Sequence, residues 1–276
     1  MKSFIKYFFI FLLILLPLSS ACVLFRDTVN FQEVSTSELK DTESEFDSAE
    51  SETAKPSGDI VVFPKSTYIA FGDSITYGAD FTRQYAQMDY PYPTLVSNTL
   101  SLKSFNNYAI SGSTIATDVD DLPSIYHQCL NASADADIVS VLGGVNDYNR
   151  SVELGTISDN STTTFYGSLN SIVSLLLEKY PDAFIFLMTP YKEDCYHQFS
   201  CTEPNSAGYN LEDYANAVKD VAELYNIPVL DMYNEGQYEL EMYNPNSDGI
   251  HPSQEFIREY TAPQIAEFIR QNYRGK

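Results

Sequence analysis

A nucleophilic site could be assembled from two short stretches that lie far apart in the sequence. The first, "YIAFGDSITYGAD" (residues 68–80), ends an apolar run on a glycine and then places Asp73 and Ser74 where the backbone must turn. The second, "SDGIHPS", holds Asp248 three residues before His251. A histidine can remove the proton of a serine hydroxyl while an acid fixes the tautomer of the ring and stabilises the imidazolium. These residue types predict a Ser-His-Asp site, although each stretch alone also suits a turn or a helix cap.

Short apolar runs alternate with helical patterns along the rest of the chain, and these elements would have to position the site. The runs predicted as strands are Tyr68–Phe71, Phe105–Ala109, Ile138–Leu142, Ala183–Met188 and Pro228–Asp231. The predicted helices are Tyr92–Leu102, Thr164–Tyr180, Leu211–Tyr225 and Ser253–Gln271. Alternation of helices with continuously apolar strands is typical of a parallel sheet that is covered on both faces. The sequence therefore predicts an α/β fold.

Polar residues follow the predicted strands, and in an open parallel sheet ligands bind beyond the carboxyl ends of the strands. Ser74 follows the first strand, Gly112 of "ISGST" the second, and Asn146 of "GGVNDYN" the third. Polar, chemically competent groups are therefore expected to collect at one edge of the sheet. Each of these residues alone also suits an ordinary turn. We interpret Asp73 and Asp147 as scaffold acids that accept hydrogen bonds from backbone amides of their own loops.

Four blocks in this order, "GDSITYG", "YAISGST", "GGVNDY" and "DGIHP", resemble the successive motifs of the GDSL/SGNH hydrolase family. The resemblance implies a three-layer α/β/α sandwich with a central parallel sheet of about five strands, similar to flavodoxin, and ester hydrolysis without a cofactor or a metal. By position it implies that Ser74 is the nucleophile, His251 the base and Asp248 the orienting acid. The oxyanion hole would combine the backbone N–H groups of Ser74 and Gly112 with the side-chain amide of Asn146.

The resemblance favours an enzyme over a binding protein. A catalytically inactive relative that binds a ligand at the cell surface is the alternative, since folds can outlast their chemistry. All five positions of the implied site hold competent residues, which a decayed site would not be expected to retain. The sequence therefore predicts a serine esterase.

The expected substrate is a short-chain acyl ester of a carbohydrate, with acetyl as the expected acyl group. No long apolar lid separates the four blocks, and Tyr77, Tyr148 and Tyr191 near the sheet edge could offer faces to a sugar. The chain has no tryptophan, which counts against a sugar platform. A lipase or lysophospholipase of the same family is the alternative. The net charge of −22 argues against a nucleic-acid partner, because such proteins carry a basic footprint.

The first 22 residues have the pattern of a secretory signal. Lys2 and Lys6 precede an apolar stretch, and small residues lead to Cys22 in "LSSAC", which resembles a bacterial lipobox although its leucine lies one position too early. Lipid on Cys22 would anchor the exported protein at the bacterial cell surface, whereas ordinary signal peptidase would secrete it. Residues 23–59 are rich in Ser, Thr and Glu and are expected to form a disordered linker. Residues 60–276 would then be the hydrolase domain.

Two of the four cysteines enclose only "YHQFS" and could close a small loop. A disulfide between Cys195 and Cys201 is expected in an oxidising compartment, within an insertion at Tyr191–Tyr209 near the site. Cys129 would then be a free, buried thiol. His197 lies between the two cysteines, but the spacing matches no common zinc site, and we expect no metal.

Overall fold

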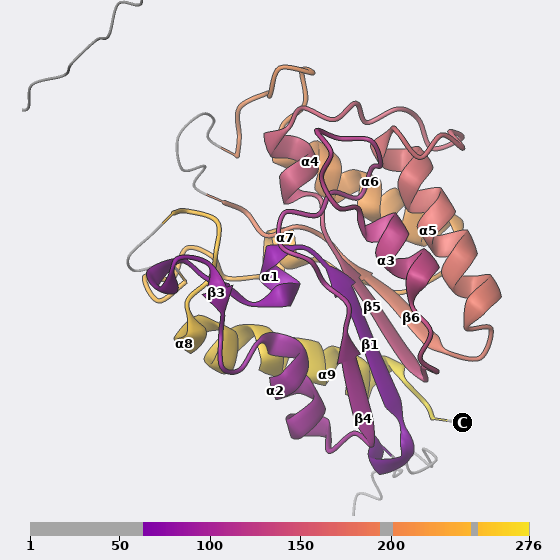
Figure 1. The fold of residues 1–276 in the computed structure, drawn as a ribbon, viewed down its shortest axis with the longest axis vertical. Coiled ribbons are helices and arrows are strands. Elements are labelled where there is room, and N and C mark those ends of the chain that lie inside the picture. Colours follow the sequence, from indigo (N-terminus) through magenta and orange to yellow (C-terminus); the bar gives the residue numbers. More distant parts are fainter. Residues whose placement is uncertain (1–62, 194–200, 244–247, 276) are drawn as a thin grey trace, which may run out of the picture. The chain divides into compact units, whose positions relative to one another are not determined.

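The central element of the protein is a sheet of five parallel strands. The computed structural model describes residues 63–193, 201–243 and 248–275. The strands are β1 (Thr67–Gly72), β4 (Ser104–Asn107), β5 (Ile138–Leu142), β6 (Phe184–Met188) and β7 (Val229–Leu230). They lie side by side in the order β4-β1-β5-β6-β7, and the first four of these are labelled in Figure 1. β1 is an interior strand, which pairs with β4 on one side and β5 on the other. It is buried along nearly its whole length.

Helices cover both faces of this sheet. On one face lie α3 (Ile125–Asn131), α5 (Phe165–Lys179) and α6 (Leu211–Leu224), and on the other lie α2 (Tyr92–Leu100) and α9 (Ala262–Asn272), as Figure 1 shows. Successive strand residues point to opposite faces. Ile69 and Phe71 therefore pack with the first group of helices, while Tyr68 and Ala70 pack with the second. The predicted three-layer α/β/α fold is confirmed.

All five predicted strands and all four predicted helical regions are present, with the last helix interrupted. The interrupted region consists of α8 (Gln254–Phe256), a π-helical turn (Ile257–Thr261) and α9. The amide of Ala262 bonds the carbonyl of Ile257, five residues earlier. Pro263 follows directly and has no N–H to donate, which favours such a local widening of the helix.

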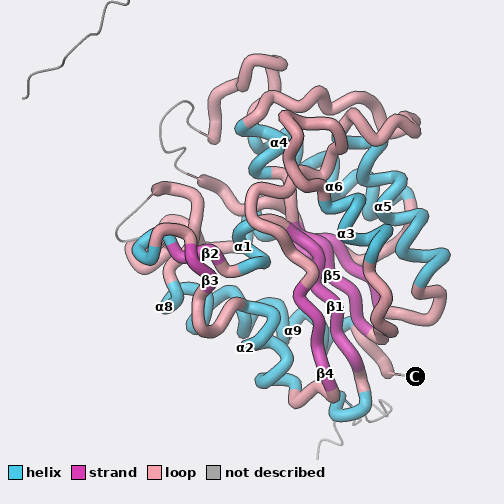
Figure 2. The backbone as a smooth tube through the Cα atoms, viewed as in Figure 1, coloured by secondary structure: helices cyan, strands magenta, loops and turns pink. Residues whose placement is uncertain are grey.

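Several short elements were not predicted. They are the helices α1 (Ser74–Tyr77), α4 (Val145–Asn149) and α7 (Met232–Glu235), the 3₁₀ turns Phe63–Lys65 and Phe81–Arg83, and a hairpin of β2 (Ala79–Asp80) and β3 (Ala86–Gln87). Figure 2 shows the hairpin apart from the main sheet. These elements are too short to give a periodic hydrophobic pattern.

The predictions for the leader and the cysteine loop fall largely outside the described residues. The signal (1–22), the linker (23–59), Cys22, Cys195 and His197 all lie there, so the domain boundaries and the disulfide remain predictions. Cys129 is a free cysteine buried in α3, and burial raises the pKa of its thiol. Among the described residues, no helix is both long and apolar enough to cross a membrane.

Candidate active site

Ser74 lies at the turn between β1 and α1. A Cβ atom on Gly72, the last residue of β1, would come within 2.1 Å of Thr76 Oγ1, so only glycine allows α1 to pack this closely on the strand. Asp73 caps α1 because its carboxylate accepts the N–H of Ile75 at 2.9 Å. The Gly-Asp-Ser sequence therefore holds Ser74 at the tip of a buried strand. The serine is 5% exposed.

Ser74, His251 and Asp248 form one chain of hydrogen bonds. Ser74 Oγ is 2.7 Å from His251 Nε2, although the two residues are 177 positions apart. His251 Nδ1 is 2.5 Å from Asp248 Oδ2. The other carboxylate oxygen, Oδ1, accepts the backbone N–H groups of Ile250 at 3.0 Å and of His251 at 2.9 Å. The structure thus brings together all three residues that the sequence predicted for proton transfer.

The charge of Asp248 is stabilised in this arrangement. Burial alone raises the pKa of the carboxyl, but the hydrogen bond from His251, the charge of that ring and the two backbone N–H donors outweigh burial. Together they lower the pKa of Asp248 to about 2. The acid is therefore ionised at neutral pH and can stabilise a positively charged imidazole.

Asn146 contacts the loop of Gly112 through Ser113, the residue that follows the glycine. The Nδ2 group of Asn146 donates to the carbonyl of Ser113 at 2.9 Å, and Ser113 directly follows Gly112. Gly112 has a φ of +83°, which favours glycine, and a Cβ there would meet nothing within 4 Å. Backbone conformation, rather than crowding within the protein, therefore explains this glycine. The two predicted oxyanion donors lie in adjoining segments.

The interpretation of Asp73 is confirmed, but that of Asp147 is wrong in its choice of partner. Asp147 lies in α4 and accepts the N–H groups of Ile115 at 2.8 Å and of Ala116 at 2.9 Å. Both donors belong to the segment that follows Gly112, so these two hydrogen bonds support a neighbouring loop. Burial raises the pKa of Asp147 to about 7, against the lowering effect of these hydrogen bonds. The sequence does not show which segment α4 will face.

We expect the pKa of Asp147 to make stability depend on pH. An unfolded aspartate ionises near pH 4, whereas the folded group holds its proton up to about pH 7. The folded state therefore binds more protons in this window, and the free energy of unfolding should fall as pH rises from about 4 to about 7. Asp147→Asn should remove this slope. Unfolding by urea at several pH values measures this slope for both proteins, and acids that do not interact with Asp147 cancel in the comparison. A difference that stays constant with pH would show that folded Asp147 is ionised throughout.

An aromatic residue that the sequence analysis missed lies beside His251. The ring of Tyr85 lies edge-on to the imidazole, with centroids 5.3 Å apart, and the residue is 45% exposed. Tyr85 and Gln84 have φ values of 63° and 56° in the turn between β2 and β3. Such a backbone is uncommon for residues other than glycine and occurs often at functional sites. The hairpin carries no glycine or proline at this turn, so its sequence gives no signal.

The tyrosines proposed to face a sugar are mostly inside the protein. Tyr148 is 0% exposed and Tyr191 is 1% exposed, so neither can stack on a ligand. Tyr148 donates to the carbonyl of Glu203 at 2.9 Å. Tyr77 is half-buried. That part of the prediction is wrong for Tyr148 and Tyr191, because both follow strand ends but turn into the core.

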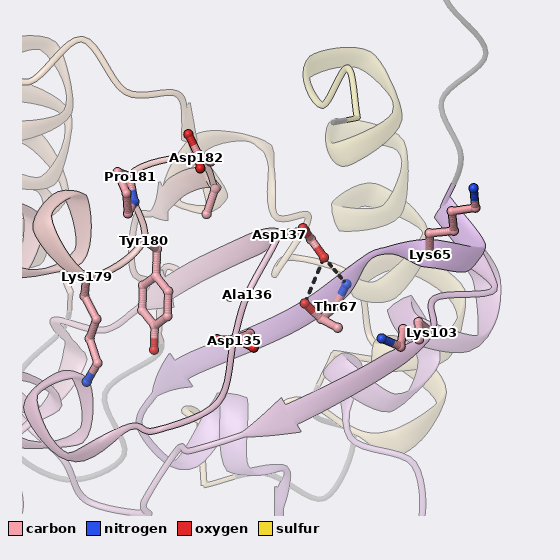
Figure 3. Close-up of a pocket in the computed structure, with 11 residues that line it drawn as sticks. Lys65, Thr67, Lys103, Asp135, Ala136, Asp137, Lys179, Tyr180, Pro181 and Asp182 are labelled. Carbon is pink, nitrogen blue, oxygen red and sulfur yellow. Dashed lines mark hydrogen bonds between the residues drawn. The ribbon is translucent and has the colours of Figure 1, made fainter.

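A cavity of about 380 Å³ lies at the opposite edge of the sheet from Ser74. Thr67, the first residue of β1, lines it and donates to Asp137 through its N–H at 2.8 Å and its hydroxyl at 2.9 Å (Figure 3). Its charges are mixed, with Lys65, Lys103, Lys179, Asp135 and Asp182 around it. This cavity is separate from the residues predicted to do chemistry. Within the described ranges, no three His, Cys, Asp or Glu side chains gather as a metal site requires.

Comparison with known proteins places the chain in a family. Residues 70–256 match the GDSL-like lipase/acylhydrolase family, and the chain belongs to it. The chain is thus a hydrolase that acts on esters. No curated protein sequence gives a significant match.

Solved structures share the fold over about three quarters of this chain. A Lactobacillus plantarum protein is 26% identical, with a TM-score of 0.66, over 77% of this chain and 99% of that one. A possible lipase from Chitinophaga pinensis is 24% identical, with a TM-score of 0.61, over 75% and 98% of the two chains. A carbohydrate acetylesterase from Sinorhizobium meliloti is 16% identical, with a TM-score of 0.56, over 76% and 100%. The last two are similar to this chain in fold.

Proposed function

We propose that this protein is an exported serine esterase in which Ser74 is the nucleophile, His251 the general base and Asp248 the orienting acid. The continuous chain from Ser74 Oγ through the imidazole to the Asp248 carboxylate carries this proposal. A serine hydroxyl is a weak nucleophile until a neighbouring base removes its proton. The Asp248 carboxylate selects the tautomer in which Nδ1 carries the proton and Nε2 can accept one.

The reaction would proceed in two acyl-transfer steps. Ser74 Oγ attacks the ester carbonyl while its proton moves to His251 Nε2, and the carbonyl oxygen becomes an oxyanion. The proton then passes from His251 to the departing alcohol, which leaves an acylated Ser74. In the second step His251 takes a proton from water while the water oxygen attacks the acyl group. The proton then passes to Ser74 Oγ as the carboxylic acid is released.

The oxyanion would be held by the N–H groups of Ser74 and Gly112 and by the side-chain amide of Asn146. A side-chain amide carries two N–H donors, so Asn146 can bond Ser113 with one and offer the other to the substrate. Donors that are fixed in place stabilise the developing charge without reorganising during the reaction.

We infer that the substrate is an acetyl or short-chain acyl ester of a carbohydrate. Tyr85 supports this choice, because an exposed aromatic ring beside the base could contact the alcohol portion of an ester. The similarity in fold to a carbohydrate acetylesterase is consistent with it. A lipase remains the second candidate, since a structure of similar fold is described as a possible lipase.

A screen of acyl chain lengths tests the substrate proposal. We expect the purified protein to hydrolyse p-nitrophenyl acetate with a kcat/KM at least about tenfold above that for the octanoate, as follows for a site that takes a short acyl chain. Release of acetate from acetylated xylan should be measurable as well. A preference for octanoate or longer chains, with no acetate released from the glycan, would support the lipase. Absence of turnover on every ester would support the binding protein.

Export and anchoring are proposed from the leader alone. Lipid on Cys22 would tether the enzyme to the cell surface through residues 23–59. Mass spectrometry of the N-terminal peptide from isolated membranes identifies the modification. A soluble extracellular protein with an unmodified terminus would show ordinary secretion instead.

A further inference from the structure

Gln128 in α3 joins the strand that carries Ser74 to the loop that carries Gly112. Its Oε1 accepts the N–H of Gly72 at 3.1 Å, and its Nε2 donates to the carbonyl of Gly72 at 2.9 Å. Nε2 also donates to Ser113 Oγ at 2.8 Å. The side chain is 5% exposed, so all three hydrogen bonds are sheltered from water. The Gln128 amide thus links the two segments, in addition to the direct hydrogen bond from the Ile110 N–H to the Gly72 carbonyl at 3.3 Å.

The bonds from Gln128 to Gly72 add to the backbone pairing at the end of β1. The β4 ladder on β1 ends where Ala70 lies opposite Asn107, two residues before Gly72. Beyond that point the Gly72 carbonyl accepts the N–H of Ile110 at 3.3 Å as well as Nε2 of Gln128, and the Gly72 N–H donates to Oε1 of Gln128. Buried backbone polar groups need such partners. Gln128 therefore fixes the end of β1, directly before Asp73 and Ser74.

Ser113 connects Gln128 to both predicted oxyanion donors. Its hydroxyl accepts from Gln128 and donates to the carbonyl of Ile110 at 2.8 Å. Its carbonyl accepts from Asn146 Nδ2 at 2.9 Å, and it is bonded covalently to Gly112. The residue is fully buried. A shift of Ser113 would therefore move the Gly112 amide and the Asn146 side chain together.

We propose that Gln128 is a positioning residue, which holds the Gly112 and Asn146 donors at a fixed place relative to Ser74. This inference rests on the proposed function, because it assigns Gln128 to the alignment of that oxyanion hole. An apolar side chain of similar length would fill the same space. A test of the positioning role must therefore remove the hydrogen bonds of the Gln128 amide and keep the volume of the side chain.

The main test is Gln128→Met, which keeps length and removes the amide. We expect kcat for p-nitrophenyl acetate to fall by about 10- to 100-fold with little change in KM, because displaced donors weaken the transition state more than the bound ester. Rates are counted per active serine, by titration with diethyl p-nitrophenyl phosphate, so that unfolded protein does not contribute. Inhibition by a boronic acid, which forms a tetrahedral adduct, should weaken by a similar factor.

Asn170→Leu is the matched control. Asn170 is another buried amide, which lies on α5 and donates to the carbonyls of Ile157 at 2.9 Å and Asp159 at 3.0 Å. It fastens a loop to a helix on the same face of the sheet. We expect this variant to lose thermal stability comparable to that lost by Gln128→Met, while kcat per titrated site stays near the wild-type value.

The outcomes separate a positioning role from a structural one. Wild-type kcat per titrated site and unchanged boronate inhibition in Gln128→Met would overturn the inference. If that variant does not fold, Ser113→Ala removes the hydroxyl that accepts from Gln128 and donates to Ile110, keeps the bonds between Gln128 and Gly72, and should lower kcat by about tenfold. A wild-type kcat in Ser113→Ala would then overturn it. Ser74→Ala tests the proposed function independently. Full activity in that variant would show that Ser74 is not the nucleophile, and Gln128 would then have no oxyanion hole beside Ser74 to align.

Discussion

Ser74→Ala is expected to lose at least about 10⁴-fold in kcat, because the nucleophile, base and acid act as one unit. The change should leave the fold intact, since the hydroxyl bonds His251 and the alanine removes only one oxygen from the turn. His251→Ala should lose a similar factor. The Ser74→Ala, His251→Ala double variant should lose little more than either one, because an incomplete unit has no further catalysis to lose.

The measurement is the initial rate with p-nitrophenyl acetate, accompanied by thermal unfolding of each variant. Ser174→Ala is the control, since this serine lies on α5 and bonds Tyr225 at 3.0 Å, away from the site. It should retain the wild-type rate. Losses for Ser74→Ala and His251→Ala that multiply in the double variant would contradict a single cooperating unit.

Asp248→Asn is expected to reduce kcat by about 10³- to 10⁴-fold. Oδ1 of Asp248 accepts the backbone N–H groups of Ile250 and His251, so an asparagine would keep its oxygen there. Its NH₂ group would then face His251 Nδ1, and that nitrogen would have to accept a hydrogen bond instead of donating one. The imidazole would carry its proton on Nε2, where it could no longer remove the proton of Ser74. Asp248 is 1% exposed, which leaves little room for solvent to replace the carboxylate.

This prediction is checked by the pH dependence of kcat/KM as well as by its size. The wrong tautomer lowers the rate across the whole neutral range, and a rise in activity at high pH alone would indicate hydroxide acting in place of the base. NMR of the imidazole nitrogens identifies the tautomer directly. Wild-type turnover with the proton still on Nδ1 would show that the carboxylate is dispensable.

Much of the candidate site could be predicted because its residues follow strands. Ser74, Gly112 and Asn146 come after β1, β4 and β5, and parallel strands bring their carboxyl ends to one edge. Asp248 and His251 were recognisable because an acid three residues before a histidine can share one turn with it. The structure confirms the fold. It joins Ser74, His251 and Asp248 by hydrogen bonds, and it places the Asn146 amide on the carbonyl of the residue after Gly112.

The supporting residues could not be predicted, since their partners are set by tertiary packing. Gln128 bonds Gly72, 56 positions away, and Asp147 bonds Ile115, 32 positions away. Each is one polar residue in a helix, and its sequence neighbours give no sign of its partner. Tyr85 depends on a hairpin whose turn has no typical turn residue. Tyr148 was assigned to the surface by its position after a strand, yet the packing against Tyr214 buries it.

The central claim is that Ser74 is the nucleophile, and covalent labelling tests it most directly. Diethyl p-nitrophenyl phosphate transfers its diethyl phosphoryl group to an activated serine oxygen and releases p-nitrophenolate. We predict that one phosphoryl group per chain will be found by mass spectrometry on the peptide that contains Ser74, and that activity will fall in proportion to labelling. A label on another residue that accompanies the loss of activity, or full activity in a chain with Ser74 labelled, would contradict the assignment.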